Sequence, residues 1–134
     1  MKRTNTTINA QLSRVILETG HTDLIVVTDA GLPIPLGCER VDLAYRPGAP
    51  AFIDVLDTVL AELIVESATI SAEIEQYSPH MLAALRERLD PLGVTIKLVP
   101  HVEFKERTRG ARAFVRSGEL TPYANVILHA GVAF

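Results

Sequence analysis

Four histidines are the residues of this sequence best suited to acid–base chemistry, because imidazole titrates near neutral pH. They stand at positions 21, 80, 101 and 129, and there is one cysteine, Cys38. None of these residues has the spacing that the ligands of a zinc site have. The sequence also has no serine-nucleophile elbow and no glycine-rich phosphate loop after a predicted strand. This inventory favours chemistry that needs no bound metal, nucleotide or other cofactor.

Each histidine has both a functional and a plainer interpretation. His21 lies between a predicted helix and a predicted strand, where it is either an acid–base group or a surface-loop residue. His101 follows Pro100 at a strand end and has the same two interpretations. His80 falls in the first turn of a predicted helix, so we expect it to be solvent-exposed. His129 either lines a site or is a satisfied histidine of the core, and we favour the core.

Asp29 is the first candidate for binding a ligand. It follows residues 24–27, a short apolar run that predicts a strand covered on both faces. In open α/β sheets, ligands bind beyond the carboxyl ends of the strands. Asp29 is therefore either a ligand-binding carboxylate or the cap of a turn.

The segment SGELTPYAN, residues 117–125, leads from a turn into an apolar strand. If residues 123–125 are extended, Tyr123 and Asn125 point to one face and Ala124 to the other. A phenol beside a carboxamide can donate hydrogen bonds to hydroxyl groups and accept them. Alternatively, Tyr123 packs as a partly buried anchor and Asn125 caps a turn.

The elements that must position these residues alternate between helix and strand. Ile8, Leu12, Val15 and Ile16 have helical spacing, with Thr6, Thr7 or Asn9 as the cap and Gly20 as a left-handed end. Residues 52–66 fit either a helix or a strand. We expect further helices over 67–75, 78–92 and 103–108, and strands over 24–28, 41–44, 94–98, 113–115 and 125–128. The pattern predicts an α/β fold, a single three-layer domain over residues 1–134 with a mostly parallel sheet flanked by helices.

Composition narrows the class of protein. The chain has 134 residues, 48% of them hydrophobic, and a net charge of −3, which gives no electrostatic reason to expect nucleic acid or a membrane surface as partner. No signal peptide or membrane span is predicted. The lone cysteine fits a reducing compartment, so we expect a cytoplasmic protein. The small aliphatic core favours association into a homo-oligomer.

Three stretches resemble the D-ribose pyranase family. They are GHTDLIVVTDAGLPIP at 20–35, PHVEFK at 100–105 and VRSGELTPYANVILHAGVAF at 115–134. The resemblance extends along the whole chain and is weakest over 66–99. The GLPIP at 31–35 favours the ribose branch over the related fucose mutarotases.

The resemblance implies an isomerase of ribose catabolism, which converts the pyranose form of D-ribose toward the furanose form. It implies that His21 is the catalytic acid/base and that no cofactor is needed. It also implies a cytoplasmic, ring-shaped homo-oligomer, commonly a decamer, with sites at subunit boundaries. The residues that would hold the sugar are Asp29, His101, Tyr123, Ala124 and Asn125.

Two alternatives remain open, a non-catalytic sugar-binding or regulatory module and a mutarotase for another monosaccharide such as fucose. One geometric point bears on the site itself. A straight strand over residues 24–29 spans about 17 Å, so His21 and Asp29 of one chain should lie near its opposite ends. Either the loop folds back or two chains share the site, and we expect the shared site.

Overall fold

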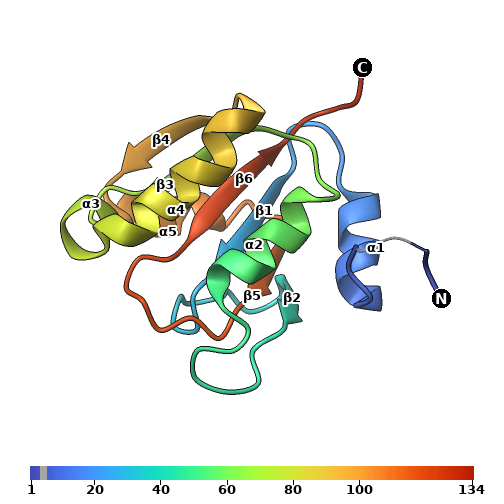
Figure 1. Cartoon of the computed structure of the whole chain (residues 1–134), viewed down its shortest axis with the longest axis horizontal. Helices are drawn as coiled ribbons and strands as arrows, with labels where there is room; N and C mark the ends of the chain where they lie inside the picture. Colours follow the sequence, from blue (N-terminus) through green and yellow to red (C-terminus); the bar gives the residue numbers. More distant parts are fainter. Residues whose placement is uncertain (4–5) are drawn as a thin grey trace.

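A six-stranded sheet organises the chain, with its strands in the order β2-β5-β1-β6-β3-β4 (Figure 1). The computed structural model describes residues 1–3 and 6–134. The strand β6 is antiparallel to its neighbours β1 and β3, whereas the other pairs are parallel. The strands are β1 (Leu24–Thr28), β2 (Glu39–Asp42), β3 (Val65–Ser71), β4 (Thr95–Val99), β5 (Ala113–Arg116) and β6 (Val126–Ala130). Five strands therefore end at one edge of the sheet, and β6 begins there.

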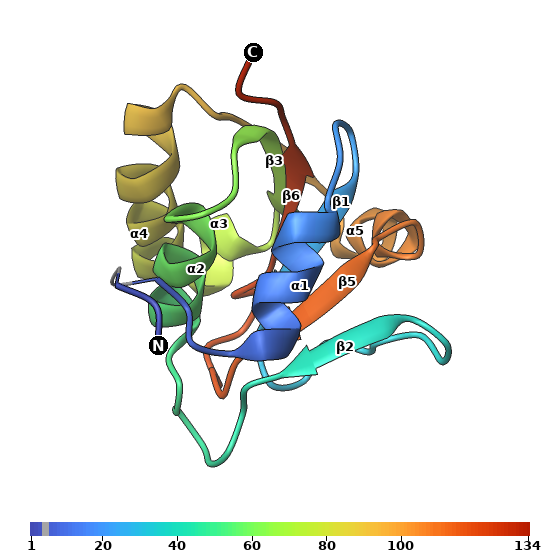
Figure 2. The same cartoon turned by 90° about the vertical axis from the view of Figure 1, so that its right-hand side faces the viewer.

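Helices cover both faces of this sheet, which confirms the three-layer α/β fold. The helices α1 (Ala10–Glu18), α2 (Phe52–Leu60) and α4 (Pro79–Leu89) bury apolar side chains in the larger core on one face. On the other face, Phe104 of α5 (His101–Thr108) packs with Val26, Phe114 and Ile127. Figure 2 shows α2 and α4 on one side of the sheet and α5 on the other.

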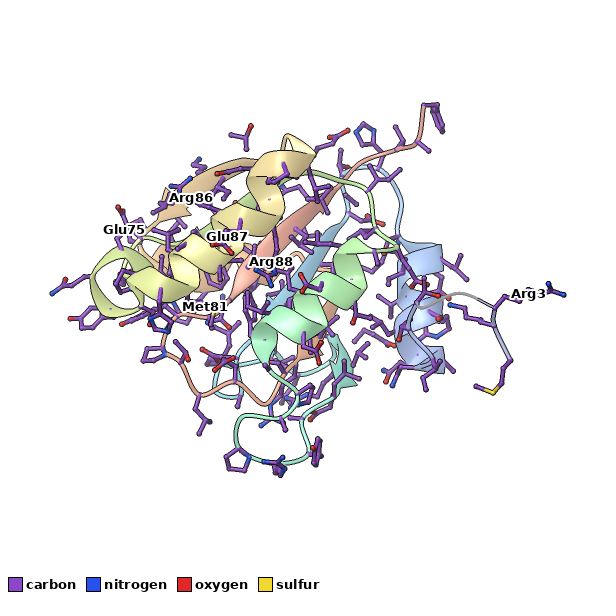
Figure 3. The ribbon with its side chains drawn as sticks, viewed as in Figure 1. Arg3, Glu75, Met81, Arg86, Glu87 and Arg88 are labelled. Atoms are coloured by element: carbon purple, nitrogen blue, oxygen red, sulfur yellow. The ribbon has the colours of Figure 1, made fainter. Side chains whose placement is uncertain are left out.

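An ion pair ties together two helices of the larger core. Arg88 of α4 donates to both carboxylate oxygens of Asp57 in α2, at 2.6 and 3.3 Å. In Figure 3, the Arg88 side chain extends from α4 toward α2. The contact fixes the spacing of two helices that rest on the same face.

The first helix begins as expected from its cap. The Asn9 side chain accepts a hydrogen bond from the Leu12 amide at 2.8 Å, which satisfies one of the free amides at the helix start. Ile8 is 84% exposed and precedes the helix, so its assignment to the apolar stripe was wrong. The stripe begins instead at Leu12, inside the cap.

The end of this helix differs from the prediction. Gly20 is not left-handed, and the C-cap is Thr19 with an extended backbone. The Thr19 hydroxyl donates to the Val15 carbonyl at 2.7 Å, and its amide bonds to the carbonyl of Ile16 at 3.2 Å. These bonds satisfy the last carbonyls without a left-handed glycine.

The helix expected over residues 67–75 is wrong. The chain forms β3 through Ser71, and only the short α3 (Ile74–Tyr77) follows. Small polar residues at 67, 69 and 71 alternate along β3 with the buried Ala68 and Ile70. Pairing with β6 and β4 decides the structure, since local preference is weak in a strand of small residues.

The remaining elements follow the pattern closely. Helix α4 continues into a 3-10 turn (Asp90–Leu92) and stops at Gly93, whose φ of 72° is left-handed. The strands β4, β5 and β6 fall within two residues of their predicted bounds. The strand β2 is displaced by two residues toward the N-terminus, and α5 begins at His101 rather than at Glu103.

Candidate active site

A pocket of about 380 Å³ opens at the edge of the sheet where the parallel strands end. The loop after β1 contributes Asp29, the first residue of α5 contributes His101, and the segment before β6 contributes Tyr123 and Asn125. This is the position at which open α/β sheets bind ligands. The rest of the lining consists of Gly31, Leu32, Pro33, Glu119, Leu120 and Pro122.

Asp29 and Asn125 form a reciprocal pair in this pocket. The Asn125 side chain accepts from the Asp29 amide at 2.8 Å and donates to its carboxylate at 2.9 Å. The other carboxylate oxygen accepts from the amides of Gly31 at 2.9 Å and Leu32 at 2.8 Å. Asp29 is thus a turn cap and part of the pocket wall at once. An ionised carboxylate has about four acceptor positions, so acceptor capacity remains for a ligand hydroxyl.

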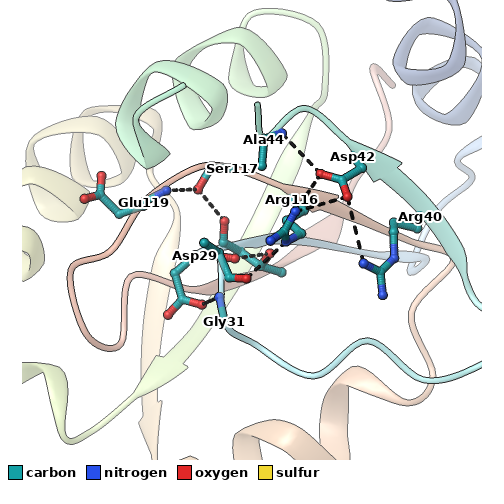
Figure 4. Close-up of polar contacts among 10 residues, drawn as sticks. Asp29, Gly31, Arg40, Asp42, Ala44, Arg116, Ser117 and Glu119 are labelled. Carbon is teal, nitrogen blue, oxygen red and sulfur yellow. Dashed lines mark hydrogen bonds and ion pairs between the residues drawn. The ribbon is translucent and has the colours of Figure 1, made fainter. Parts of the chain in front are cut away.

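A second set of polar contacts holds the loop that carries Asp29 (Figure 4). Arg116, at the end of β5, donates to the Ala30 carbonyl at 3.1 Å and to the Asp42 carboxylate at 3.0 Å. The Ser117 hydroxyl donates to the carbonyl of Thr28 at 2.6 Å. These contacts come from neighbouring strands, so the sheet itself fixes the loop.

His101 is held on both its backbone and its ring. Its amide donates to the Glu73 carboxylate at 2.9 and 3.0 Å, and its Nδ1 lies 2.7 Å from the buried hydroxyl of Ser71. Burial lowers the pKa of His101, and nearby Lys105 lowers it further, against the opposing carboxylates of Glu73 and Asp29. The lowered pKa favours the neutral imidazole, and Nδ1 is the ring nitrogen that meets Ser71.

Tyr123 reaches the pocket through a turn rather than through a strand. Its φ of 62° is left-handed, and the amide of Asn125 donates back to its carbonyl at 2.8 Å, so residues 123–125 form a turn and the extended alternative does not hold. Both side chains still line the pocket, while Ala124 is fully buried in the core. The Tyr123 ring contacts His101 edge-on, with centroids 5.1 Å apart, and Tyr77 at 5.5 Å.

His21 is not part of this pocket. It lies before β1, whereas Asp29 follows β1, so the two residues stand at opposite edges of the sheet, as the strand length predicts. The His21 side chain is 52% exposed, and its Nε2 lies 3.0 Å from a carboxylate oxygen of Glu66. Within one chain, the pocket brings together Asp29, His101, Tyr123 and Asn125, but neither Ala124 nor His21 lines it.

The other two histidines take the plainer roles expected of them. His80 is exposed at the start of α4. His129 is partly buried on β6 and lies outside the pocket, with its Nε2 3.1 Å from the Thr69 hydroxyl. Burial lowers the pKa of His129, and Arg107 lowers it further.

Glu119 is a pocket residue that the sequence pattern did not single out. Burial would raise the pKa of this carboxyl, but hydrogen bonds from the amide of Phe52 and from Thr121 outweigh burial and lower it. The carboxylate joins the start of α2 to the loop before β6. Its only signal in the sequence was its place two residues after Ser117 in the turn-rich segment.

The arrangement suits a small hydroxylated molecule. A carboxylate, a carboxamide, a neutral imidazole and a phenol face one open pocket, and together they offer both donors and acceptors. Across residues 1–3 and 6–134, no three side chains of the His, Cys, Asp or Glu type come together as metal ligands would. No helix of that same part of the chain is long and apolar enough to cross a membrane.

Fold and pocket define a small three-layer α/β protein with a polar pocket at the sheet edge. The model of the RbsD / FucU transport protein family matches residues 1–133. A D-ribose pyranase of Laribacter hongkongensis is 56% identical over 130 residues, covering 97% of this chain and 98% of the relative. Another, of Symbiobacterium thermophilum, is 51% identical over 134 residues and covers both chains fully. The chain therefore belongs to the RbsD / FucU family.

Two solved structures are also similar. Bacillus subtilis RbsD, solved in complex with D-ribose, has a TM-score of 0.93 and 39% identity, covering 99% of this chain and 100% of that chain. The fucose mutarotase of Streptococcus pneumoniae, solved in complex with L-fucose, has a TM-score of 0.82 and 26% identity and covers both chains fully. Both branches of the family share this fold.

Proposed function

We propose that this chain is a D-ribose pyranase, an isomerase that interconverts the pyranose and furanose forms of D-ribose. The observation that carries the proposal is the convergence of Asp29, His101, Tyr123 and Asn125 on one pocket. It is supported by relatives named D-ribose pyranase at 56% and 51% identity over nearly the whole chain. The similar structure solved with D-ribose supports the same ligand class.

The reaction needs only proton transfer. Ring opening removes the proton of the anomeric hydroxyl, breaks the bond from the anomeric carbon to the ring oxygen, and protonates that oxygen. The open aldehyde then recloses through a different hydroxyl, and the protons return in reverse. No C–H bond breaks and no electrons leave the sugar, so an acid–base group near neutral pH is sufficient, and such catalysis contributes about 10²–10⁴-fold.

His21 of a neighbouring copy supplies this acid–base group. In the pocket itself, Asp29 is held by amides and His101 is held through Nδ1, which suits both to orienting hydroxyl groups. His21 lies exposed at the opposite edge of its own chain, where a second subunit can meet it. The exposed apolar side chains of Val102 and Leu120 beside the pocket support such a contact. The active protein is then a cytoplasmic homo-oligomer, a ring such as a decamer, and Ala124 contributes only its backbone.

Exchange spectroscopy tests the proposal directly. Saturation transfer between the pyranose and furanose signals of D-ribose should be rapid with the wild-type protein and should slow about 100-fold or more with His21→Ala. His80→Ala removes an exposed histidine away from the pocket and should exchange at the wild-type rate. Binding of ribose without exchange would indicate a regulatory module. Exchange of fucose in preference to ribose would indicate a mutarotase for that sugar.

A further inference from the structure

A carboxylate lies against the histidine at the far edge of the sheet. The Oε1 of Glu66 is 3.0 Å from the Nε2 of His21. We propose that Glu66 is a positioning residue for catalysis, which orients the His21 ring and holds a proton on Nε2. This proposal rests on the proposed function, in which His21 exchanges protons with the sugar.

Backbone irregularity places Glu66 where it can reach His21. Val65 pairs with Ala130 of β6 and Ser67 pairs with His129, so two steps along β3 match one step along β6. Glu66 is the extra residue of this bulge. A bulge re-aims a side chain that regular pairing would direct elsewhere, and bulges are frequent beside active sites.

The neighbouring glycine leaves room for the carboxylate. A Cβ added to Gly131 would lie 2.6 Å from Cγ of Glu66 and 3.2 Å from its Cδ and Oε1. The Glu66 side chain therefore lies directly over the α-carbon of Gly131, and its neighbour in the chain, Ala130, bonds to the turn that carries His21. A larger residue at 131 would press on the Glu66 side chain, so the glycine leaves the carboxylate room beside His21.

The turn that presents His21 is fixed on both sides. The Asp23 carboxylate accepts from the Gly20 amide at 2.8 Å and from Arg112 at 2.7 Å. The amide of Thr22 donates to the Ala130 carbonyl at 3.0 Å, and Thr22 has a φ of 70°. A non-glycine residue in the left-handed region persists only where its surroundings hold it. With the backbone fixed in this way, the ring of His21 is the part left for Glu66 to orient.

The chemistry of the contact assigns the roles of the two ring nitrogens. An ionised carboxylate only accepts hydrogen bonds, so Nε2 of His21 is the donor and Nδ1 is left to exchange the proton. When Nδ1 takes the proton of the anomeric hydroxyl, the ring becomes cationic and the Glu66 carboxylate offsets that charge. The proton then passes to the ring oxygen, and His21 returns to its starting form. The same roles are found in catalytic triads, where a carboxylate orients a histidine through one ring nitrogen and the other nitrogen exchanges the proton.

Two substitutions of Glu66 test the proposal in the full-length protein. With Glu66→Ala we expect the ribose exchange rate at saturating ribose to fall about 10- to 100-fold, because the His21 ring is no longer held in place, while the ribose Kd stays unchanged. Glu66→Gln keeps the shape but not the charge and should lose about tenfold. The ¹⁵N signals of the His21 ring should report protonated Nε2 in the wild type and a mixture of tautomers in Glu66→Ala. Glu87→Gln, on α4 (Figure 3), removes an exposed carboxylate elsewhere and should match the wild type.

The outcomes separate this proposal from the function on which it rests. Full exchange by His21→Ala would overturn the proposed role of His21, whatever Glu66 does. Loss of exchange in His21→Ala, together with wild-type rates for Glu66→Gln and Glu66→Ala, would overturn only the positioning role. A rise in the ribose Kd at an unchanged rate would also overturn it, because a positioning residue acts on the proton transfer. The melting temperature and oligomer size of each variant show whether the fold is intact.

Discussion

At the scale of single residues, the pocket is built from polar groups that are already engaged on one side. Asn125 bonds to Asp29, and Ser71 bonds to His101. Each side chain therefore has only its remaining hydrogen-bonding positions for a ligand. Such preorganisation costs little at the moment of binding, because the side chains lose no further freedom. Burial also lowers the pKa of His101, which favours the neutral form of its ring.

Two partly buried histidines, His101 and His129, determine how we expect stability to depend on pH. The pKa values of His101 and His129 are lowered, mainly by burial, so below about pH 6.5 the unfolded chain binds protons that the folded chain does not. The free energy of unfolding should therefore be flat from pH 8 to about 7 and fall as the pH drops from about 6.5 toward 5. Urea denaturation across this range measures the slope. A variant with Asn at both positions should show a flatter curve, and an unchanged slope would contradict the assignment.

Carboxylates give a separate window at lower pH. Hydrogen bonds from the amides of Gly20 and His101 lower the pKa values of Asp23 and Glu73, respectively. Their stabilising contribution is complete above the pKa of the unfolded chain, about 4, and is lost as the pH falls below it. The histidine effect begins near pH 6.5 and the carboxylate effect near pH 4, so the onset of each can be followed in one titration.

At the scale of elements, the sequence pattern correctly predicted the helices and strands whose formation depends on residues close together in the chain. The capped start of α1, the proline start of α4 and the apolar run of β1 each carry a clear signal, and each element forms. The strand β3 carries only a short alternation of small polar residues with Ala68 and Ile70, which we misassigned to a helix, and pairing with β6 and β4 decides its structure. This error concealed Ser71 and Glu73, the two residues that hold His101. The residues that support the pocket could not be predicted, because the element that carries them was misassigned.

One close approach between loops predicts a large effect of a single methyl group. A Cβ on Gly118 would lie 2.6 Å from the carbonyl carbon and 2.7 Å from the nitrogen of Ala49, and backbone atoms cannot move aside as a side chain can. Gly118→Ala should destabilise the fold by about 1–3 kcal/mol, as overpacking does, and should weaken ribose binding by displacing the loop that carries Glu119. Thermal unfolding and ribose titration measure the two effects.

Gly110→Ala is the matched control for that variant. An added Cβ at Gly110 meets nothing within 4 Å, and its φ is not in the left-handed region. The change should be neutral or slightly stabilising, because alanine restricts the unfolded chain. Equal melting temperatures for the two alanine variants would show that the 118 loop yields to the methyl group.

At the scale of the whole molecule, the sheet topology separates the candidate functional residues into two groups. Five strands run in one direction, so the residues that follow β1 and β4 gather at one edge with those that precede β6. Residues that precede β1 and follow β6 gather at the other edge, where His21 and Glu66 lie. The sequence predicted this separation from strand length alone. The shared site that we propose from this separation depends on contacts between chains, which no pattern within one chain encodes.

Subunit complementation follows from that division. If each site takes His21 from one chain and Asp29 from its neighbour, then neither His21→Ala nor Asp29→Asn is active alone, but a mixed oligomer regains intact sites. In a random equal mixture the chance that both contributions are wild type is one half times one half, so about a quarter of the sites should recover in a symmetric assembly. Exchange spectroscopy on subunits mixed by denaturation and refolding measures the recovery. Each variant refolded alone serves as the control.

The same experiment separates a shared site from one within a single chain. If the turn at His21 folded back onto its own pocket, every mixed oligomer would contain only chains that lack one of the two groups, and mixing would restore nothing. The geometry argues against folding back, because the contacts of Asp23 with Gly20 and Arg112 hold that turn at its own edge of the sheet. Recovered exchange that rises with the fraction of mixed neighbours therefore requires His21 to act across a subunit boundary. Absence of recovery in assemblies shown to be mixed would mean that no site combines His21 of one chain with Asp29 of another.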